Sequence, residues 1–318
     1  MSAAAARPLS PLGDDVRAGL SRQQKELSPT LFYDRRGSEL FEAITRLPEY
    51  YLTRTERLLL ATQMPPVIAR LAPRTLVELG AGSAAKTRLL LSAMQAPGGH
   101  ITYVPIDVSA DFLSETASRL GAELPGLHVV PVVADIAVGL GLPRGLPRPA
   151  LFAFLGSTIG NFDAHAAVAL LRRVRDAMCP GDHFLLGVDL QKDVRVIEAA
   201  YNDAAGVTAE FNRNVLYVLN RELGADFDPD AFEHRARYNT LAYRIEMHLV
   251  ARRALDVHIP QVGRVSFRAG ESIRTEISCK YDRESVQRLF TAAGLVLAEW
   301  VSNDEPAYAL AIGAVDAR

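Results

Sequence analysis

The chain has 318 residues, 49% of them hydrophobic and 23% charged, which is enough to bury a large core in one domain or two. Its formal net charge is −2 at pH 7, so no broad electrostatic attraction draws it to a phosphate backbone, and we expect no nucleic-acid partner. No apolar stretch approaches the roughly 20 residues of a membrane helix, and the N-terminus lacks the apolar segment of a signal peptide, so we expect a cytoplasmic protein.

The first fifty residues predict helices over 15–26 and 38–45, followed by an aromatic turn over 47–51. From about residue 55, helices alternate with short apolar strands. The predicted helices are 55–71, 84–94, 110–120 and 164–178, and the predicted strands are 75–79, 101–106, 127–133, 150–155 and 183–188. Short apolar strands separated by helices indicate a parallel sheet that is covered on both faces.

After Asp189 this alternation ends. Residues 191–281 mix helices with longer strands, and the chain then closes with a helix and two strands that we expect to join the first sheet. The predicted elements are helices 193–204, 208–222 and 283–293, and strands 242–251, 264–267, 295–301 and 308–313. The sequence therefore predicts an α/β domain over 55–190 and 282–318. A second, α+β domain would form from an N-terminal arm and an insertion, residues 8–54 and 191–281.

A glycine-rich turn over 78–83 joins a predicted strand to a helix. Glycine lets the backbone turn tightly and approach a ligand, and the helix start offers free N–H groups. Asp107 ends the next strand, where its carboxylate can accept both hydroxyls of a ribose. The same pattern, Gly80-x-Gly82-x-x-Ala85, also fits a dinucleotide fingerprint. An NAD-dependent oxidoreductase is therefore open at this point.

Later segments favour S-adenosylmethionine over NAD as the cofactor. The Pro-Gly turn in 177–182 and the final helix–strand–loop–strand resemble features of class I S-adenosylmethionine-dependent methyltransferases. Asp135 follows the third strand, where such enzymes commonly hold the adenine amino group, and Ile136 could pack on the adenine face. A dehydrogenase would need an acid–base group at the site of hydride transfer, and no convincing His or Tyr–Lys pair is placed for it.

Eight further segments occur in order along most of the chain: TLFYD at 30–34, GSELFE at 37–42, TRLPEYY at 45–51, FLGSTIGN at 154–161, AAY at 199–201, FNRNV at 211–215, RIEM at 244–247 and TEISCK at 275–280. Together they resemble the histidine Nα-methyltransferase family of ergothioneine biosynthesis. The resemblance implies a Rossmann-like class I methyltransferase sheet and a second domain built as described above. Its activity would be methylation of the α-amino group of L-histidine, up to the trimethylated betaine hercynine.

The resemblance also implies roles for individual residues. S-adenosyl-L-methionine would be held by Gly80, Ser83, Lys86, Asp107, Asp135 and Ile136. The region around the reacting amine would include Tyr33, Gly156 and Asn161. The substrate pocket would be formed by Phe41, Tyr50, Asn161, Tyr201, Met247, Glu276 and Ser278. Asn161 and Tyr201 would fix the amino-acid backbone, Glu276 and Ser278 would read the imidazole, and Met247 would lie against the ring.

Without the resemblance, each of these residues has an ordinary structural explanation. Asn161 could form an Asx turn, Tyr33 and Tyr50 could be core aromatics, Lys86 could be a solvated charge, and Met247 could fill a core.

Three alternatives for the function remain open. They are a methyltransferase of the same fold acting on another amino acid or small amine, the NAD-dependent oxidoreductase, and a silent scaffold that binds a protein. The spacing of the histidines predicts no metal site, and nothing indicates an obligate protein partner.

Overall fold

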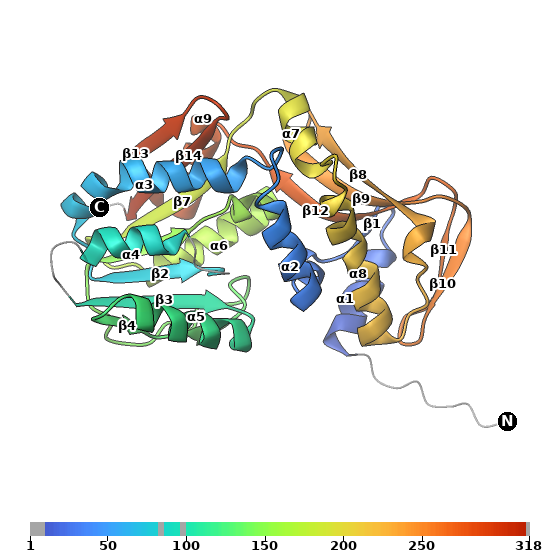
Figure 1. Ribbon diagram of the computed structural model, residues 1–318, viewed down its shortest axis with the longest axis horizontal. Helices are drawn as coiled ribbons and strands as arrows, with labels where there is room; N and C mark the ends of the chain where they lie inside the picture. The colour runs from blue at the N-terminus through green and yellow to red at the C-terminus, as the bar shows by residue number, and fades with distance from the viewer. Residues whose placement is uncertain (1–9, 82–85, 96–99, 316–318) are drawn as a thin grey trace. The chain divides into compact units, whose positions relative to one another are not determined.

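The computed structural model describes residues 10–81, 86–95 and 100–315, apart from the side chains of residues 111 and 112 (Figure 1). The chain divides into two compact units. The large unit comprises Leu52–Lys192 and Cys279–Arg318, and the small unit comprises Met1–Tyr51 and Asp193–Ser278. The domain boundaries predicted from the sequence lie between residues 54 and 55, 190 and 191, and 281 and 282.

Within the described residues, the large unit contains an eight-stranded sheet with the order β13-β14-β7-β6-β2-β3-β4, and β5 also pairs with β3. The strands are β2 (Thr75–Leu79), β3 (Ile101–Asp107), β4 (Leu127–Val129), β5 (Val132–Val133), β6 (Ala150–Phe154), β7 (His183–Asp189), β13 (Leu295–Asn303) and β14 (Tyr308–Val315). Strands β2 to β7 pair in parallel, whereas β14 runs antiparallel to both of its neighbours. This is a mainly parallel, Rossmann-like sheet, as the sequence predicts.

Helices cover both faces of this sheet. They are α3 (Leu52–Leu71), α4 (Thr87–Gln95), α5 (Ala110–Glu123), α6 (Ala164–Ala177) and α9 (Arg283–Ala293). The connections through α4 and α5 step toward the β4 edge and the one through α6 steps toward β7. Right-handed crossovers therefore place α6 on the opposite face. Helix α3 packs beside α4, and α9 packs beside α6 (Figure 1).

In the small unit, the order of the main sheet is β1-β12-β9-β8, and β10 and β11 form a separate hairpin. The strands are β1 (Lys25–Glu26), β8 (Phe232–Asn239), β9 (Arg244–Ala251), β10 (Leu255–Ile259), β11 (Gly263–Phe267) and β12 (Ser272–Cys279). The helices are α1 (Pro11–Leu20), α2 (Arg35–Ile44), α7 (Val194–Tyr201) and α8 (Val207–Leu223), with short 3₁₀ turns η1 (Pro29–Phe32) and η3 (Pro229–Ala231). Helix α8 packs on α2, β8 and β9, which gives an α+β arrangement.

Several predicted elements differ from the structure. The helix expected over 15–26 ends at Leu20, and Lys25–Glu26 instead pairs with β12, because a long-range strand contact overrides local helix propensity. The strand expected over 127–133 is divided into β4 and β5 around Pro131, which has no N–H to give to a ladder. Strands β8 and β10 were not predicted. In β8, charged and apolar residues are mixed without a clean alternation.

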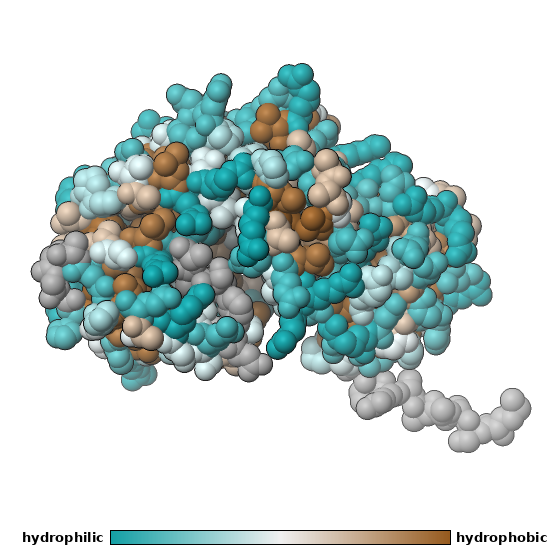
Figure 2. Space-filling view, viewed as in Figure 1, coloured by the Kyte–Doolittle hydropathy of each residue, from teal (hydrophilic) through white to brown (hydrophobic). Residues whose placement is uncertain are grey.

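The hydrophobic residues are concentrated in the cores of the two units. The face drawn in Figure 2 is mainly hydrophilic, with small hydrophobic clusters between charged side chains. Fully buried residues such as Val77, Val104, Phe152 and Leu186 form the centre of the large unit. Among the described residues, none of the helices is both long and apolar enough to span a membrane.

A buried glutamate joins three elements of the large unit. Glu78 of β2 is 3% exposed, and its carboxylate accepts a hydrogen bond from Thr87 Oγ1 of α4 at 2.5 Å and another from the Tyr103 hydroxyl of β3. Burial raises the pKa of Glu78 to about 7, although both hydrogen bonds act in the opposite direction. The native state thus holds a proton on Glu78 that the unfolded chain releases near pH 4.5.

This difference predicts a pH-dependent contribution to stability. The stabilisation is fully present below the unfolded pKa and is lost as pH rises through the folded pKa of about 7. As pH rises from 5 to 7, the ionisation of Glu78 in the unfolded chain should lower the free energy of unfolding by up to about 1.4 kcal/mol for each pH unit. The variant Glu78→Gln cannot titrate, so its stability relative to wild type should rise across this window and level off above it.

Urea unfolding at half-unit steps from pH 5 to 8 measures this difference. The control is Glu39→Gln, which removes an exposed carboxylate of α2. A Glu78→Gln difference that stays constant over the whole range would contradict the assignment.

Candidate functional site

The positions predicted to hold the cofactor lie in the large unit, at the carboxyl ends of neighbouring strands. Gly80 follows β2, Asp107 ends β3 and Asp135 follows β5. The carboxyl ends of parallel strands meet along one edge of a sheet, where ligands of such folds bind. Gly80 has a φ of +65°, which favours glycine, and its N–H donates to the Ile106 carbonyl at 2.8 Å. Ser83 lies outside the described residues.

The two aspartates are oriented by their own backbones. Asp107 is half-buried and its Oδ1 accepts the N–H of Ser109 at 3.2 Å, while Asp135 is exposed and its Oδ1 accepts the N–H of Ala137 at 2.8 Å. Ile136 is half-buried against the core of the large unit. Carboxylates accept hydrogen bonds from hydroxyl and amino groups, and an apolar side chain can cover a ring. This set therefore fits the ribose and adenine of S-adenosylmethionine.

Lys86, just before α4, is not a simple surface charge. Its side chain is 24% exposed, and its Nζ donates to Glu56 Oε2 at 2.6 Å. Glu56 lies on α3 with no exposed surface. A lysine ammonium has three donors, so this contact leaves Lys86 able to bind a further acceptor.

The turn after β6 carries two of the predicted residues near the amine, Gly156 and Asn161. Gly156 and Ser157 have φ values of +79° and +57°, and a left-handed conformation at a non-glycine residue is strained. The turn is held on two sides. The Gly156 N–H donates to the Glu56 oxygens at 2.8 and 2.9 Å, and the Asp189 N–H donates to Ser157 Oγ at 2.9 Å. Asn161 ends the short helix η2 (Thr158–Asn161) and is half-buried.

The small unit brings together a series of predicted aromatic residues. The ring centroids of Tyr33 and Phe41 lie 6.0 Å apart, those of Phe41 and Tyr50 6.3 Å, and those of Tyr50 and Tyr201 6.3 Å. The Tyr201 hydroxyl donates to Ser278 Oγ at 3.1 Å, so the series ends on β12. Tyr33 is 48% exposed, which a residue that only filled a core would not be.

Tyr201 is fixed by a neutral histidine that sequence reasoning missed. Nε2 of His234 lies 2.8 Å from the Tyr201 carbonyl, and Nδ1 lies 2.8 Å from Asn212 Nδ2. Burial lowers the pKa of His234, which favours the neutral ring with its proton on Nε2. Nothing in the sequence separates this histidine from others on a mixed strand.

Strand β12 carries the two residues predicted to read an imidazole. Glu276 is half-buried and Ser278 is buried, and residues two apart on a strand point to the same face. Met247 is 2% exposed on the alternately buried side of β9, and its carbonyl accepts a hydrogen bond from Thr275 Oγ1 at 3.1 Å. Whether Met247 touches a substrate ring stays a prediction.

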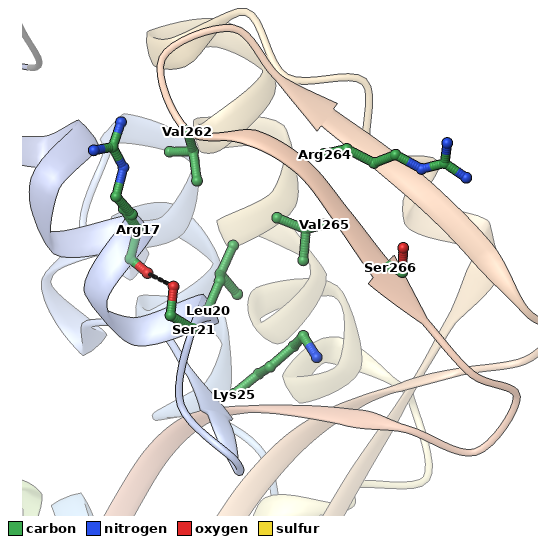
Figure 3. A pocket seen from close by; sticks show the side chains of 8 residues that line it. All are labelled: Arg17, Leu20, Ser21, Lys25, Val262, Arg264, Val265 and Ser266. Atoms are coloured by element: carbon green, nitrogen blue, oxygen red, sulfur yellow. Dashed lines mark hydrogen bonds between the residues drawn. The ribbon is translucent and has the colours of Figure 1, made fainter.

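A cavity of about 250 Å³ in the small unit lies among α1, β1 and β11 and contains none of these residues (Figure 3). Three basic side chains line it, but each has a partner. Arg17 donates to the Gln261 carbonyl at 2.9 Å, Lys25 pairs with Glu271, and Arg264 pairs with Asp256. Arg17 and Arg264 extend away from one another. In the part of the chain that the structure describes, no three His, Cys, Asp or Glu residues are grouped so that they could hold a metal ion.

Comparisons with known proteins identify the family. The family described as histidine-specific methyltransferase, SAM-dependent, matches residues 12–314. The histidine N-alpha-methyltransferase of Mycolicibacterium smegmatis is 46% identical, with 94% of this chain and 93% of that protein covered. Ergothioneine biosynthesis protein 1 of Neurospora crassa is 31% identical over 88% of this chain and 32% of that longer protein.

A solved structure supports the fold alone. A DUF574 family protein from Streptomyces avermitilis superposes with a TM-score of 0.50 at 14% identity, covering 90% of this chain and 96% of that one. The extent of the family match sets aside the NAD-dependent alternative. The chain belongs to the family of histidine-specific, S-adenosylmethionine-dependent methyltransferases.

Proposed function

We propose that this protein transfers methyl groups from S-adenosylmethionine to the α-amino group of L-histidine, up to the trimethylated betaine hercynine, in the cytoplasmic biosynthesis of ergothioneine. The observation that carries the proposal is the family match over residues 12–314. The grouping of the aromatic residues with Tyr201 and Ser278 in the small unit supports it. The partner we infer is this small-molecule substrate, with no obligate protein partner.

The large unit would hold the methyl donor. Asp107 would accept the ribose hydroxyls, Asp135 would accept the adenine amino group, and Ile136 would cover the ring. Gly80, Ser83 and Lys86 would hold the remainder of the cofactor. When bound, S-adenosylmethionine supplies a methyl carbon that the sulfonium has already activated. The main task of the protein is therefore alignment of the amine with that carbon, which alone can lower a barrier by several kcal/mol.

The groups around the amine suit a reaction that builds positive charge on nitrogen. Tyr33, Phe41 and Tyr50 are neutral aromatics, and aromatic faces attract methylated ammonium groups. Asn161 and Tyr201 would hold the α-carboxylate and the amine through neutral donors and acceptors. A neutral pocket of this kind lets the amine attack in its unprotonated form. In each round an N–C bond would form as the sulfonium S–C bond breaks, which leaves a neutral thioether. After the first and second rounds the ammonium would release a proton to a tyrosine hydroxyl, an amide oxygen or water, and so recover the lone pair for the next attack.

Specificity for histidine would reside on β12. Glu276 would accept the imidazole N–H, Ser278 would reach the second nitrogen, and Met247 would lie against the ring. The competing proposal is a methyltransferase of the same fold for another amino acid or amine. Glu276 discriminates between the two, because an aliphatic or phenyl side chain would leave its carboxylate without a substrate donor.

Replacing Glu276 by Ala should lower kcat/KM for histidine roughly tenfold or more, equivalent to about 1.4 kcal/mol. Discrimination against phenylalanine and tryptophan should weaken at the same time, because no carboxylate remains to penalise rings that cannot donate to it. The measurement is kcat/KM for the three amino acids in wild type and variant.

The matched control is Glu271→Ala, which removes another carboxylate next to β12, one paired with Lys25. This variant should leave the ratio of histidine to the other amino acids unchanged. An unchanged ratio in Glu276→Ala would show instead that Glu276 does not read the imidazole.

A further inference from the structure

Glu56 lies at a junction of four elements of the large unit. It is fully buried on α3, and its carboxylate accepts from Lys86 Nζ at 2.6 Å, from the Gly156 N–H at 2.8 and 2.9 Å, and from the Tyr308 hydroxyl at 2.7 Å. The carboxylate also lies against Gly187 of β7, where only glycine fits, because a Cβ there would lie 2.0 Å from Glu56 Oε1.

Two of these partners are residues assigned above to binding. Lys86 belongs to the proposed cofactor set, and Gly156 belongs to the turn proposed to face the amine. They also lie beside each other, because a Cβ on Gly156 would be 2.9 Å from Lys86 Nζ. A side chain at 156 would therefore displace the ammonium, in addition to opposing the positive φ of that residue.

We propose that Glu56 is a positioning residue for methyl transfer, which fixes the Lys86 ammonium for the cofactor and holds the Gly156 turn in its left-handed conformation. This inference rests on the proposed function, in that it takes Lys86 as a cofactor ligand and Gly156 as a pocket residue. Glu56 itself has no exposed surface and acts through these two groups.

The first part of the role is orientation. A lysine ammonium sits on a flexible four-carbon stem, and fixing it before the ligand arrives removes part of the entropic cost of binding. The hydrogen bond to Glu56 occupies one of three donors and leaves the others for the cofactor.

The second part is charge. An isolated ammonium next to Gly156 would oppose the positive charge that grows on the substrate nitrogen, and burying it without a partner would be costly. The Glu56 carboxylate at 2.6 Å compensates this charge. Lys86 can then serve the cofactor without penalising the reaction.

The first test uses Glu56→Gln, which keeps the shape of the side chain and removes its charge. Isothermal titration with S-adenosylmethionine alone should give a Kd raised roughly tenfold or more, because Lys86 loses a charged hydrogen-bond partner. The matched control is Asp182→Asn. Asp182 is also a buried carboxylate of the large unit, paired with Arg148 and accepting the N–H groups of Ala150 and Cys179 at 2.7 and 2.6 Å. Its loss should leave the Kd unchanged.

A double-mutant cycle tests whether Glu56 acts through Lys86. Lys86→Met alone should weaken binding, and adding Glu56→Gln to it should change the Kd less than about threefold. Steady-state kinetics give a second readout. In Glu56→Gln, kcat for histidine should fall even when S-adenosylmethionine is saturating, because the Gly156 turn and the charge beside the amine are both altered.

Three results would overturn the proposal: a folded Glu56→Gln variant with the wild-type Kd, an equal loss in Asp182→Asn, or a full effect of Glu56→Gln in the Lys86→Met background. If Glu56→Gln does not fold, Glu56→Asp, which keeps the charge and withdraws it by one methylene, is judged by the same criteria. Titration without an amino acid does not depend on histidine being the substrate. If Lys86→Met leaves the Kd unchanged, the cofactor assignment of Lys86 fails as well, and the two failures are distinguished.

Discussion

A carboxylate buried away from water must accept hydrogen bonds to offset the cost of its burial, and the large unit contains several buried carboxylates that do so. Glu56 accepts hydrogen bonds from a lysine, a backbone N–H and a tyrosine hydroxyl, which come from three separate segments. Glu78 joins α4 and β3 to β2, and Asp182 secures the turn before β7. Glu56 and Glu78 fix segments near the carboxyl ends of β6 and β2, at the edge of the sheet where a nucleoside cofactor would bind. Asp182 instead fixes the opposite edge, at the amino ends of β6 and β7.

Asp189 is another buried carboxylate of the large unit, and it pairs with residues at the two points where the chain leaves this unit and returns to it. Asp189 is fully buried, accepts from Lys280 Nζ at 2.9 Å, and also pairs with Lys192. Lys192 is the last residue of the large unit before the chain leaves it, and Lys280 follows directly after its return. Burial lowers the pKa of Lys192 to about 8. The backbone N–H of Asp189 also donates to Ser157 Oγ, so the same residue contacts both lysines and the left-handed turn after β6.

The sequence specifies some parts of this molecule through local signals. Helix α9 has an Asp282 N-cap, a capping box with Ser285 and a terminal Gly294 at φ +80°, and its predicted bounds match the structure. Strand β2 is a short apolar run between turn signals, and it was also placed correctly. The pairing of Lys25–Glu26 with β12 spans almost the whole chain and leaves no local trace.

The same limit applies to the candidate site. Gly80 and Asp107 are visible as a turn and a strand end, whereas Glu56 looks like one more polar residue in a helix whose burial no periodicity reveals. Its importance arises only from what Lys86, Gly156 and Tyr308 place around it. The family resemblance supplied the substrate residues as a set. The structure adds the aromatic contacts, the hydrogen bond from the Tyr201 hydroxyl to Ser278 of β12, and the histidine that holds Tyr201.

The identity of the methyl acceptor can be tested by incubating the protein with S-adenosylmethionine that carries an isotopically labelled methyl group, with one amino acid at a time, and following the products by tandem mass spectrometry. If the acceptor is the α-amino group of histidine, histidine gains up to three labelled methyl groups, all on the α-nitrogen, and the other amino acids gain far less. Methylation of the imidazole ring, or efficient transfer to another amino acid with none to histidine, would contradict this assignment.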